Sequence, residues 1–314
     1  MKQQFRNGMQ FKAYVKKLAK ENDVTAQLIL QEIMLDELLE RLSVSTYKNN
    51  MVLKGGFLIA SLIGVDTRST MDLDTTLVGY PLSLKSITNA FTDICSIEVD
   101  NDQIEMTVIN VEPIRKDDEY GGYRVHIDAV ILDVQTVIKV DVSTGDKMTP
   151  KEIHYKHKLI TEDRKIPILA YNLETVLAEK LESIVARGNA NTRAKDFYDV
   201  YQLNKLEQQN IDFPLLKKAI LRTAEKRKTT SFLTDYSSRL DSVKETPVLI
   251  RLWKRYGEDH DYAEGIDFVD TVDAAKELLD FTKISIANCK NKLATPQAKL
   301  RGMSEYLLKI GIND

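Results

Sequence analysis

The first clear pattern of apolar and polar positions lies near the N-terminus, over residues 8–48. Between Leu28 and Leu42, apolar residues recur mostly every three or four positions, and acidic side chains occupy much of the remaining face. This spacing is that of an amphipathic helix whose apolar stripe packs on a core. Thr25 stands directly before the pattern. Because threonine is a favoured N-cap residue, we expect a helix to begin there.

The pattern changes between residue 52 and about residue 145, where helical and alternating stretches are mixed. Short apolar runs with helical spacing predict buried helices, whereas alternating or β-branched runs predict strands. The last two strands are separated by a short polar break and are expected to form a hairpin or to lie side by side. The expected elements are helices over 57–64 and 83–95, and strands over 71–79, 123–132 and 137–144.

From residue 171 onward the pattern is almost wholly helical. Pro167 marks a boundary, and Asn172 or Thr175 is placed to cap the next helix. No stretch recurs at a fixed period, which argues against a solenoid. Strands interleaved with helices indicate a mixed α/β (α+β) fold with a mixed sheet. The predicted parts are an N-terminal helical segment (1–48), an α/β core (49–170) and a helical C-terminal domain (171–314).

Composition and charge narrow the classes of protein. The net charge of −3 gives no overall case for nucleic-acid binding, but it does not exclude a local basic face. The N-terminus lacks the apolar core of a signal peptide. The longest apolar stretch, residues 57–65, is too short to span a bilayer. We therefore expect a cytoplasmic protein without a membrane segment.

The cysteines and histidines predict neither a disulfide nor a metal site. Cys95 and Cys289 lie far apart and form no paired pattern, so we expect two free thiols in a reducing compartment. His154 and His157 stand three residues apart in a basic stretch, which we expect to be solvated rather than to bind a metal.

Two carboxylates, Asp72 and Asp74, occupy alternate positions of the predicted strand over 71–79. Alternate strand residues point to the same face, roughly 6–7 Å apart along the chain. Magnesium prefers oxygen ligands and usually takes one or two carboxylates together with phosphate oxygens. Bound there, it would stabilise the attacking and leaving oxygens of a displacement at phosphorus. The alternative is an exposed strand edge with solvated charges.

The glycine pair Gly55-Gly56 precedes the predicted helix at 57–64. Paired glycines let the backbone approach a phosphate, and the helix N-terminus supplies N–H donors and the positive end of its dipole. Lys54, Arg68 and Ser69 are further candidates for binding phosphate. The alternatives are a plain turn and a surface cation.

A third carboxylate would complete a catalytic set. Asp141 is flanked by valines in a predicted core strand, where a carboxylate costs free energy unless it is paired or bound to a metal. It could instead lie on a solvent-facing side of that strand. Asp128, in the preceding predicted strand, is a rival for the same role.

A second charged cluster lies in residues 177–203. Lys180 and Arg187 are seven residues apart and share a helical face, and Asp196 and Asp199 share another. Arg193 and Lys195 add two cations. Such a cluster could grip a triphosphate and position a nucleophile. The alternative is salt bridging on a helix surface.

Together these stretches resemble the nucleotidyltransferase superfamily, which has a glycine-containing turn, a helix, a strand with two aspartates and a later acidic strand residue. The chain looks most like the AbiEii/AbiGii-type toxins of bacterial abortive-infection and toxin–antitoxin systems. The spacing from Gly56 to Asp72 is longer than is common in the superfamily but fits this family. The matching stretches, which cover about the middle half of the chain in the family's order, are LKGGFLIASL, TRSTMDLDTT, VDVSTGD and LAEKLESIVARGNANTRAKDFYDVYQL.

The resemblance implies a nucleotidyltransferase-like core and an enzyme of class 2.7.7. Such an enzyme takes a nucleoside triphosphate with Mg²⁺ (or Mn²⁺) and transfers the nucleotidyl group to an acceptor hydroxyl. In related toxins the acceptor is a tRNA 3′ end, whose blocking arrests growth as part of phage defence. A cognate antitoxin encoded nearby neutralises the toxin.

The resemblance also implies roles for individual residues. The catalytic residues would be Asp72, Asp74, Lys180 and Asp196. Nucleotide binding would fall to Lys54, Gly55, Gly56, Arg68, Ser69 and Arg187. The metal ligands would be Asp72 and Asp74, with Asp141 as the third.

Two other functions stay open. One is an enzyme of the same fold that modifies a protein or a small molecule, and the other is a catalytically silent protein that binds nucleotide or a partner. The sequence leaves open the nucleotide, the acceptor, the oligomeric state and the antitoxin's mode of action. If tRNA is the acceptor, cations must bind its backbone. The candidates, which could equally be solvated helix faces, are Lys217, Lys218, Arg222, Lys226, Arg227, Lys228, Lys254 and Arg255.

Overall fold

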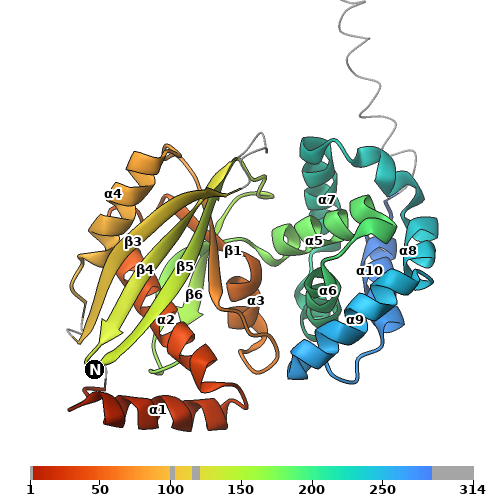
Figure 1. Cartoon of the computed structure of the whole chain (residues 1–314). Coiled ribbons are helices and arrows are strands. Elements are labelled where there is room, and N and C mark those ends of the chain that lie inside the picture. The colour runs from red at the N-terminus through yellow and green to blue at the C-terminus, as the bar shows by residue number, and fades with distance from the viewer. Residues whose placement is uncertain (1–2, 100–102, 115–120, 285–314) are drawn as a thin grey trace, which may run out of the picture. The chain divides into compact units, whose positions relative to one another are not determined.

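The computed structural model describes residues 3–99, 103–114 and 121–284. The chain divides into two compact units, Met1–Val176 and Leu177–Asp314, and the division falls inside one helix (Figure 1). The predicted division into three parts, with boundaries after residues 48 and 170, stays a prediction.

The first unit contains a seven-stranded mixed sheet in the order β3-β4-β5-β2-β1-β7-β6. Strand β2 is parallel to β5 and antiparallel to β1, while β1 is parallel to β7. The other neighbouring pairs are antiparallel. The mixed α/β fold predicted from the sequence is therefore confirmed. The strands are β1 (Met51–Lys54), β2 (Asp72–Leu77), β3 (Ile104–Ile114), β4 (Gly122–Ile131), β5 (Val134–Thr144), β6 (Ile153–Lys158) and β7 (Lys165–Ala170).

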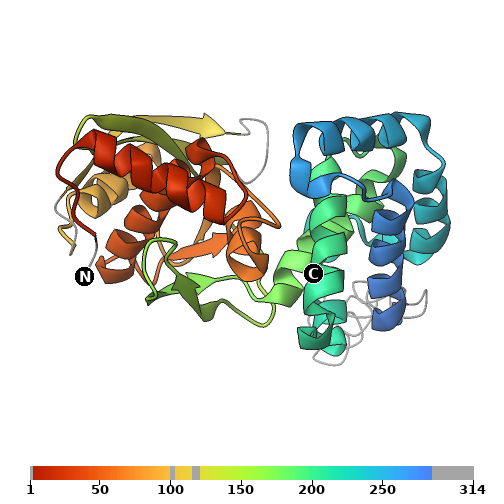
Figure 2. The same cartoon turned by 90° about the horizontal axis from the view of Figure 1, so that it is seen from below.

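Four helices accompany this sheet: α1 (Gly8–Glu21), α2 (Ala26–Val44), α3 (Gly55–Ile63) and α4 (Leu84–Cys95). Helix α2 packs on β5 and β7, α4 packs on β3 and β4, and α1, red in Figure 2, packs against α2. Along β5, Ile138, Val140 and Val142 are fully buried, whereas the residues between them are not. One face of this part of the sheet is therefore core, and the other carries polar side chains.

Local signals in the sequence placed several elements correctly. Thr25 caps α2, because its hydroxyl accepts a hydrogen bond from the Leu28 N–H at 3.3 Å. Ser83 and Ser86 form a capping box at the start of α4. Strands β4 and β5 form the expected hairpin.

The prediction of a solvated basic stretch around His154 and His157 was wrong for His157. The stretch forms strand β6, in which the exposed fraction of His157 is 1%. Its Nε2 lies 2.6 Å from Oδ1 of Asp36, and its Nδ1 lies 2.7 Å from Oγ of Ser61. A buried imidazole needs such partners, and these link α2, α3 and β6.

Among the described residues of the second unit, all the regular elements are helices (Figure 1). Helix α10 packs against α6, α7 and α8, and α9 packs against α6. Of the two predicted caps for α5, Asn172 is the one used, since its Oδ1 accepts from the Thr175 N–H at 3.1 Å. The helices are α5 (Leu173–Arg187), α6 (Ala194–Glu207), α7 (Phe213–Arg227), α8 (Tyr236–Lys244), α9 (Pro247–Asp259) and α10 (Phe268–Thr282).

Within the described ranges, no helix has the length and apolar character needed to cross a bilayer. Cys95 is a buried free thiol, and burial raises its pKa to about 12. It is therefore protonated and unreactive at neutral pH. Cys289 lies outside the described residues.

Candidate active site

The sheet of the first unit brings the two predicted metal carboxylates together on β2. Asp72 is exposed and Asp74 is partly buried. Being two residues apart on a strand, they point to the same face. Asp74 is in register with Lys54 of β1 on one side and with Asp141 of β5 on the other. The sheet therefore gathers the residues of three separate sequence motifs at one place.

Gly55, the first residue of α3, stands where the backbone conformation and the nearby Asp74 carboxylate both require a glycine. Its φ is +69°, in the left-handed region, and a Cβ added there would lie 2.1 Å from Oδ2 of Asp74. No side chain fits at that distance, so only glycine lets the Asp74 carboxylate lie against the start of α3. The Asp74 carboxylate thus depends on the first glycine of the pair.

Gly56 leaves room for Arg68. A Cβ on Gly56 would come within 3.1 Å of Nη2 of Arg68 and 3.4 Å of Oγ1 of Thr70. The Arg68 side chain is buried, and its Nη1 donates a hydrogen bond to the Ser69 carbonyl. A fixed cation thus lies at the first turn of a nine-residue helix. There it adds to the N–H groups and the positive dipole end that favour an anion.

Lys54 is tied to the end of β5. Its Nζ donates to Oγ of Ser143 at 2.8 Å and forms an ion pair with Asp146. The ammonium also lies 5.9 Å from the centre of the Tyr171 ring. Sequence reasoning missed Ser143 and Asp146. The one signal that could have found them is the turn VSTGD directly after Asp141, which carries both.

Asp141 has a partner that the sequence did not reveal. Nε and Nη2 of Arg124 on β4 donate to its Oδ1 and Oδ2 at 2.7 and 2.8 Å. The hydrogen bond to Asp141 raises the pKa of Arg124 above its usual range, and the nearby carboxylates of Asp72 and Glu112 act in the same direction. The guanidinium therefore stays charged.

The rival Asp128 lies further along the sheet. It is in register with Val137, four residues from Asp141 on β5, and both of its carboxylate oxygens accept from Nε2 of Gln135 at 2.8 Å. Four residues of strand span about 13 Å. Of the two candidates for a third carboxylate, Asp141 is thus the one beside Asp74.

The side chains of Asp72 and Asp74 suit a divalent cation that prefers oxygen ligands and takes only a few of them from the protein. Among the residues that the structure describes, no group of three or more His, Cys, Asp or Glu side chains could hold a metal ion. Asp72 and Asp74 supply two carboxylates, which suits Mg²⁺ because it keeps waters and takes phosphate oxygens as further ligands. Gly55 leaves the space that the Asp74 carboxylate needs.

The second charged cluster forms in the helical unit. Nζ of Lys180 on α5 lies 3.1 Å from Oδ1 of Asp196 and 2.6 Å from Oδ2 of Asp199, both on α6. Nε of Arg193 lies 3.1 Å from Oδ2 of Asp196. Asp196 and Asp199 are 2% and 0% exposed. These charges are buried and mutually paired rather than spread over a helix surface.

The remaining predicted cations of this unit behave differently. The Arg187 side chain is exposed, and its guanidinium makes no ion pair or hydrogen bond with any residue that the structure describes. Lys195 is also exposed. Arg227 is bound within the unit, because its guanidinium forms ion pairs with Glu179 and Glu182. Lys254 and Arg255 pair with Glu258 and Asp259 one helical turn further on.

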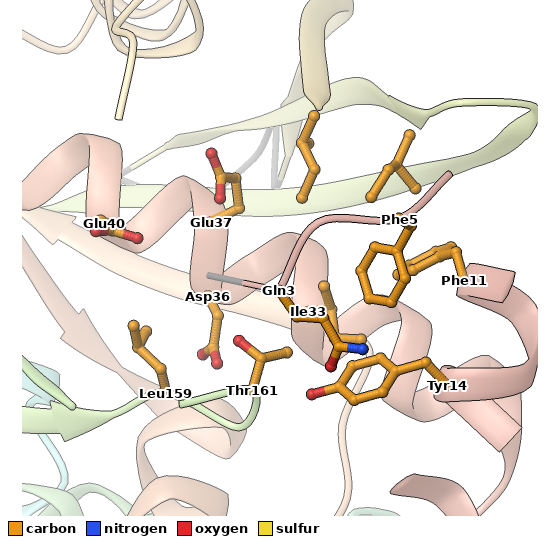
Figure 3. Close-up of a pocket in the computed structure, with 12 residues that line it drawn as sticks. Gln3, Phe5, Phe11, Tyr14, Ile33, Asp36, Glu37, Glu40, Leu159 and Thr161 are labelled. Atoms are coloured by element: carbon orange, nitrogen blue, oxygen red, sulfur yellow. The ribbon is translucent and has the colours of Figure 1, made fainter. Parts of the chain in front are cut away.

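A pocket in the first unit contains none of the predicted site residues. Figure 3 shows Phe5, Phe11 and Tyr14 on one side of it and Asp36 and Glu40 projecting from α2. The acidic side chains have structural partners. Asp36 also accepts from the Ile160 N–H at 2.7 Å, Glu37 binds Arg41 at 3.1 Å, and Glu40 binds Arg164 at 2.6 Å.

Glu32, one turn before Asp36 on α2, makes the fold sensitive to pH. Burial raises its pKa well above the ordinary 4.5, and the Asp36 carboxylate adds to the shift. The folded chain then holds a proton that the unfolded chain releases, so the free energy of unfolding falls as pH rises above 4.5. Glu32→Gln should raise stability at neutral pH and remove this dependence. Urea denaturation of the natural chain and of Glu32→Gln, from mildly acidic to neutral pH, measures this dependence. If the free energy of unfolding changes equally with pH in both chains, Glu32 is not its source.

The fold and the sheet site define a class of protein. The structure is similar to MenT4, a nucleotidyltransferase toxin from Mycobacterium tuberculosis, with a TM-score of 0.50 and 17% identity over 86% of this chain and 97% of that one. It is also similar to a candidate nucleotidyltransferase from H. pylori, with a TM-score of 0.51 and 15% identity over 82% of this chain and 96% of that one. At these identities the likeness shows the fold, which is that of a nucleotidyltransferase.

The sequence then gives the family. The model of the family described as "Nucleotidyl transferase AbiEii toxin, Type IV TA system" matches residues 37–277. The chain belongs to this family of nucleotidyltransferase toxins, as its motifs predicted. No curated protein matches it.

Proposed function

We propose that this toxin transfers a nucleotidyl group from a nucleoside triphosphate to the 3′ end of a tRNA, with Mg²⁺ or Mn²⁺. The supporting observation is the meeting of Asp72 and Asp74 with the N-terminus of α3. There Gly55 has no side chain that would exclude the Asp74 carboxylate. Carboxylates beside a phosphate-binding helix end are the groups that phosphoryl chemistry needs.

Each residue then has a distinct task. Asp72 and Asp74 hold the cation, which supplies charge neutralisation at the phosphates. The N–H groups of Gly55 and Gly56, with Arg68 and Ser69, bind phosphate oxygens. The acceptor oxygen attacks the α-phosphorus in line, the bond from the α-phosphorus to the bridging oxygen breaks, and pyrophosphate leaves. Orientation and fixed charges supply most of the rate.

Lys180, Asp196 and Arg187 are proposed to act in the same reaction, as the family resemblance implies. Lys180 would contact the triphosphate, and Asp196 would orient the attacking group or accept its proton. Arg187, exposed on α5, has a guanidinium available for a phosphate.

The acceptor and the setting are part of the proposal. We propose tRNA as the acceptor, a cytoplasmic location, a role in abortive infection and phage defence, and a cognate antitoxin as partner. Lys218, exposed on α7, and Arg222, partly exposed on the same helix, remain candidates for binding the tRNA backbone.

The test is transfer of label from each α-³²P nucleoside triphosphate, with Mg²⁺, to total tRNA or cell extract. We expect label in the RNA band with the natural chain and none with Asp72→Asn. The matched control is Asp163→Asn, because the Asp163 side chain is fully exposed and far along the chain from β2. Label in protein bands would show that the acceptor is a protein and not tRNA. Full labelling by Asp72→Asn would refute the assigned role of the carboxylates.

A further inference from the structure

Lys139 of β5 lies beside the exposed carboxylate of the proposed metal site. It is in register with Asp72 of the neighbouring strand β2. Residues in register on neighbouring strands lie about 4.8 Å apart and point to the same face of the sheet. Val140, the next residue along β5, is fully buried, so Lys139 belongs to the polar face of the sheet and not to the core face. Only the register of β5 on β2 places this lysine at the site.

The ammonium group of Lys139 is available to a ligand. Lys139 is exposed and makes no ion pair or hydrogen bond with any residue that the structure describes. Two other cations of the site differ in this respect. Lys54 forms an ion pair with Asp146, and the guanidinium of Arg124 donates to both oxygens of Asp141. Of these three cations, Lys139 is therefore the one that the described residues leave without a bound carboxylate.

The two strands beside β2 give the site two different sides. On one side lies β1, which leads directly into α3 with Gly55 and Gly56, and on the other lies β5 with Lys139. In the proposed reaction, the start of α3 binds the phosphates that leave as pyrophosphate. The attacking and leaving oxygens of a phosphoryl transfer stand roughly in line, on opposite sides of the phosphorus. A leaving group at α3 therefore places the attacking hydroxyl on the side of β5.

We propose that Lys139 binds the acceptor, through the phosphodiester that precedes its terminal nucleoside. This inference rests on the proposed function of the same site and adds to it the place where the acceptor lies. A tRNA 3′ end carries such a phosphate close to the attacking hydroxyl, whereas the hydroxyl of a protein side chain does not. Lysine contacts to backbone phosphates position a nucleic acid without reading its sequence. Lys139 thereby favours an RNA acceptor over a protein.

Equilibrium binding of total tRNA, without nucleoside triphosphate, tests this apart from turnover. Lys139→Gln should raise the dissociation constant for tRNA by about three- to tenfold, because it removes one partly screened contact with a phosphate. The salt dependence of the affinity on a double-logarithmic plot should become shallower by about 0.7, the value for one phosphate of a single strand. Lys139→Arg keeps the charge and should bind tRNA as the natural chain does. In both variants the affinity for nucleoside triphosphate with Mg²⁺ should be unchanged.

The matched control is Lys156→Gln. Lys156 is also an exposed strand residue without an ion pair or hydrogen bond to any described residue. Its strand, β6, is the edge strand of the sheet and is separated from β2 by β1 and β7. Loss of this charge should leave the affinity for tRNA and its salt dependence unchanged. Thermal melting shows that each variant is folded.

Four outcomes would overturn the proposal. They are no binding of tRNA to the natural chain, unchanged tRNA affinity of Lys139→Gln, an equal loss of affinity in Lys156→Gln, and weaker binding of nucleoside triphosphate by Lys139→Gln with unchanged tRNA affinity. The last would assign Lys139 to the triphosphate. The labelling assay judges the proposed function separately. If the natural chain labels tRNA while Lys139→Gln binds it normally, only the inference about Lys139 fails, whereas absence of label in tRNA refutes the proposed acceptor itself.

Discussion

Replacing Lys180 by methionine should lower the free energy of unfolding of the helical unit by about 3–5 kcal/mol, because it leaves buried carboxylates without their cation. Lys180 lies 3.1 Å from Asp196 and 2.6 Å from Asp199, which are almost fully buried. Arg193 partly compensates Asp196, because its Nε lies 3.1 Å from Oδ2 of Asp196. Urea denaturation of the full chain, followed by far-ultraviolet circular dichroism, measures the change.

The matched control is Lys195→Met, since Lys195 is exposed on α6 and its loss should change stability by less than about 0.5 kcal/mol. Lys180→Met/Asp199→Asn should recover much of the lost stability, because it removes a buried charge along with its cation. Unchanged stability of Lys180→Met would show that the cluster does not depend on this lysine. Any activity loss of the variant would then report on the reaction itself.

Gly55→Ala should reduce nucleotidyl transfer by about 100-fold or more while the chain stays folded. The added Cβ would meet Oδ2 of Asp74 at 2.1 Å, so the carboxylate must move by an ångström or more. Displacements of about 1 Å in a reacting set cost rates of that order. The left-handed backbone adds about 1–2 kcal/mol of strain. The labelling assay measures the rate, and thermal melting shows that the chain is folded.

Gly79→Ala separates the effect of backbone strain from the effect of displacing the Asp74 carboxylate. Gly79 also has a left-handed φ, +63°, but a Cβ there would meet only Nδ2 of Asn50, at 3.7 Å. This variant should carry the backbone strain alone and keep its transfer rate. Equal losses of activity in both variants would show that strain, and not the contact with Asp74, explains the effect.

Elements with strong local signals were predictable from the sequence. Helices α2 and α4 begin directly after Thr25 and Ser83, whose hydroxyls satisfy N–H groups that would otherwise lack partners. Strands β1 and β7 were not predicted, because the four residues of β1 show no alternation and β7 contains Pro167, which indicated a boundary. His157 was misplaced because its partners, Asp36 and Ser61, lie far from it in sequence.

The residues of the candidate site fall into the same two groups, those with a local signal in the sequence and those placed only by the fold. Gly55, Asp72 and Asp74 lie within a single stretch of about 20 residues, so their pattern is visible in the sequence. Arg124 could not be identified, because only the register of β4 on β5 places it at Asp141. Ser143 and Asp146 could not be identified for the same reason, since they become partners of Lys54 only in the folded sheet.

The position of β2 between β5 and β1 has a consequence for the order of folding. The contact of Oγ1 of Thr75 with the Asp141 carbonyl, at 3.3 Å, joins residues 66 positions apart, whereas β4 and β5 meet through a short turn. Closing a long loop costs more entropy than closing a hairpin, so the β2–β5 pairing forms late. During synthesis, β2 emerges well before its neighbour β5. The chain therefore passes through an interval in which Asp72 and Asp74 exist but do not yet lie beside Asp141.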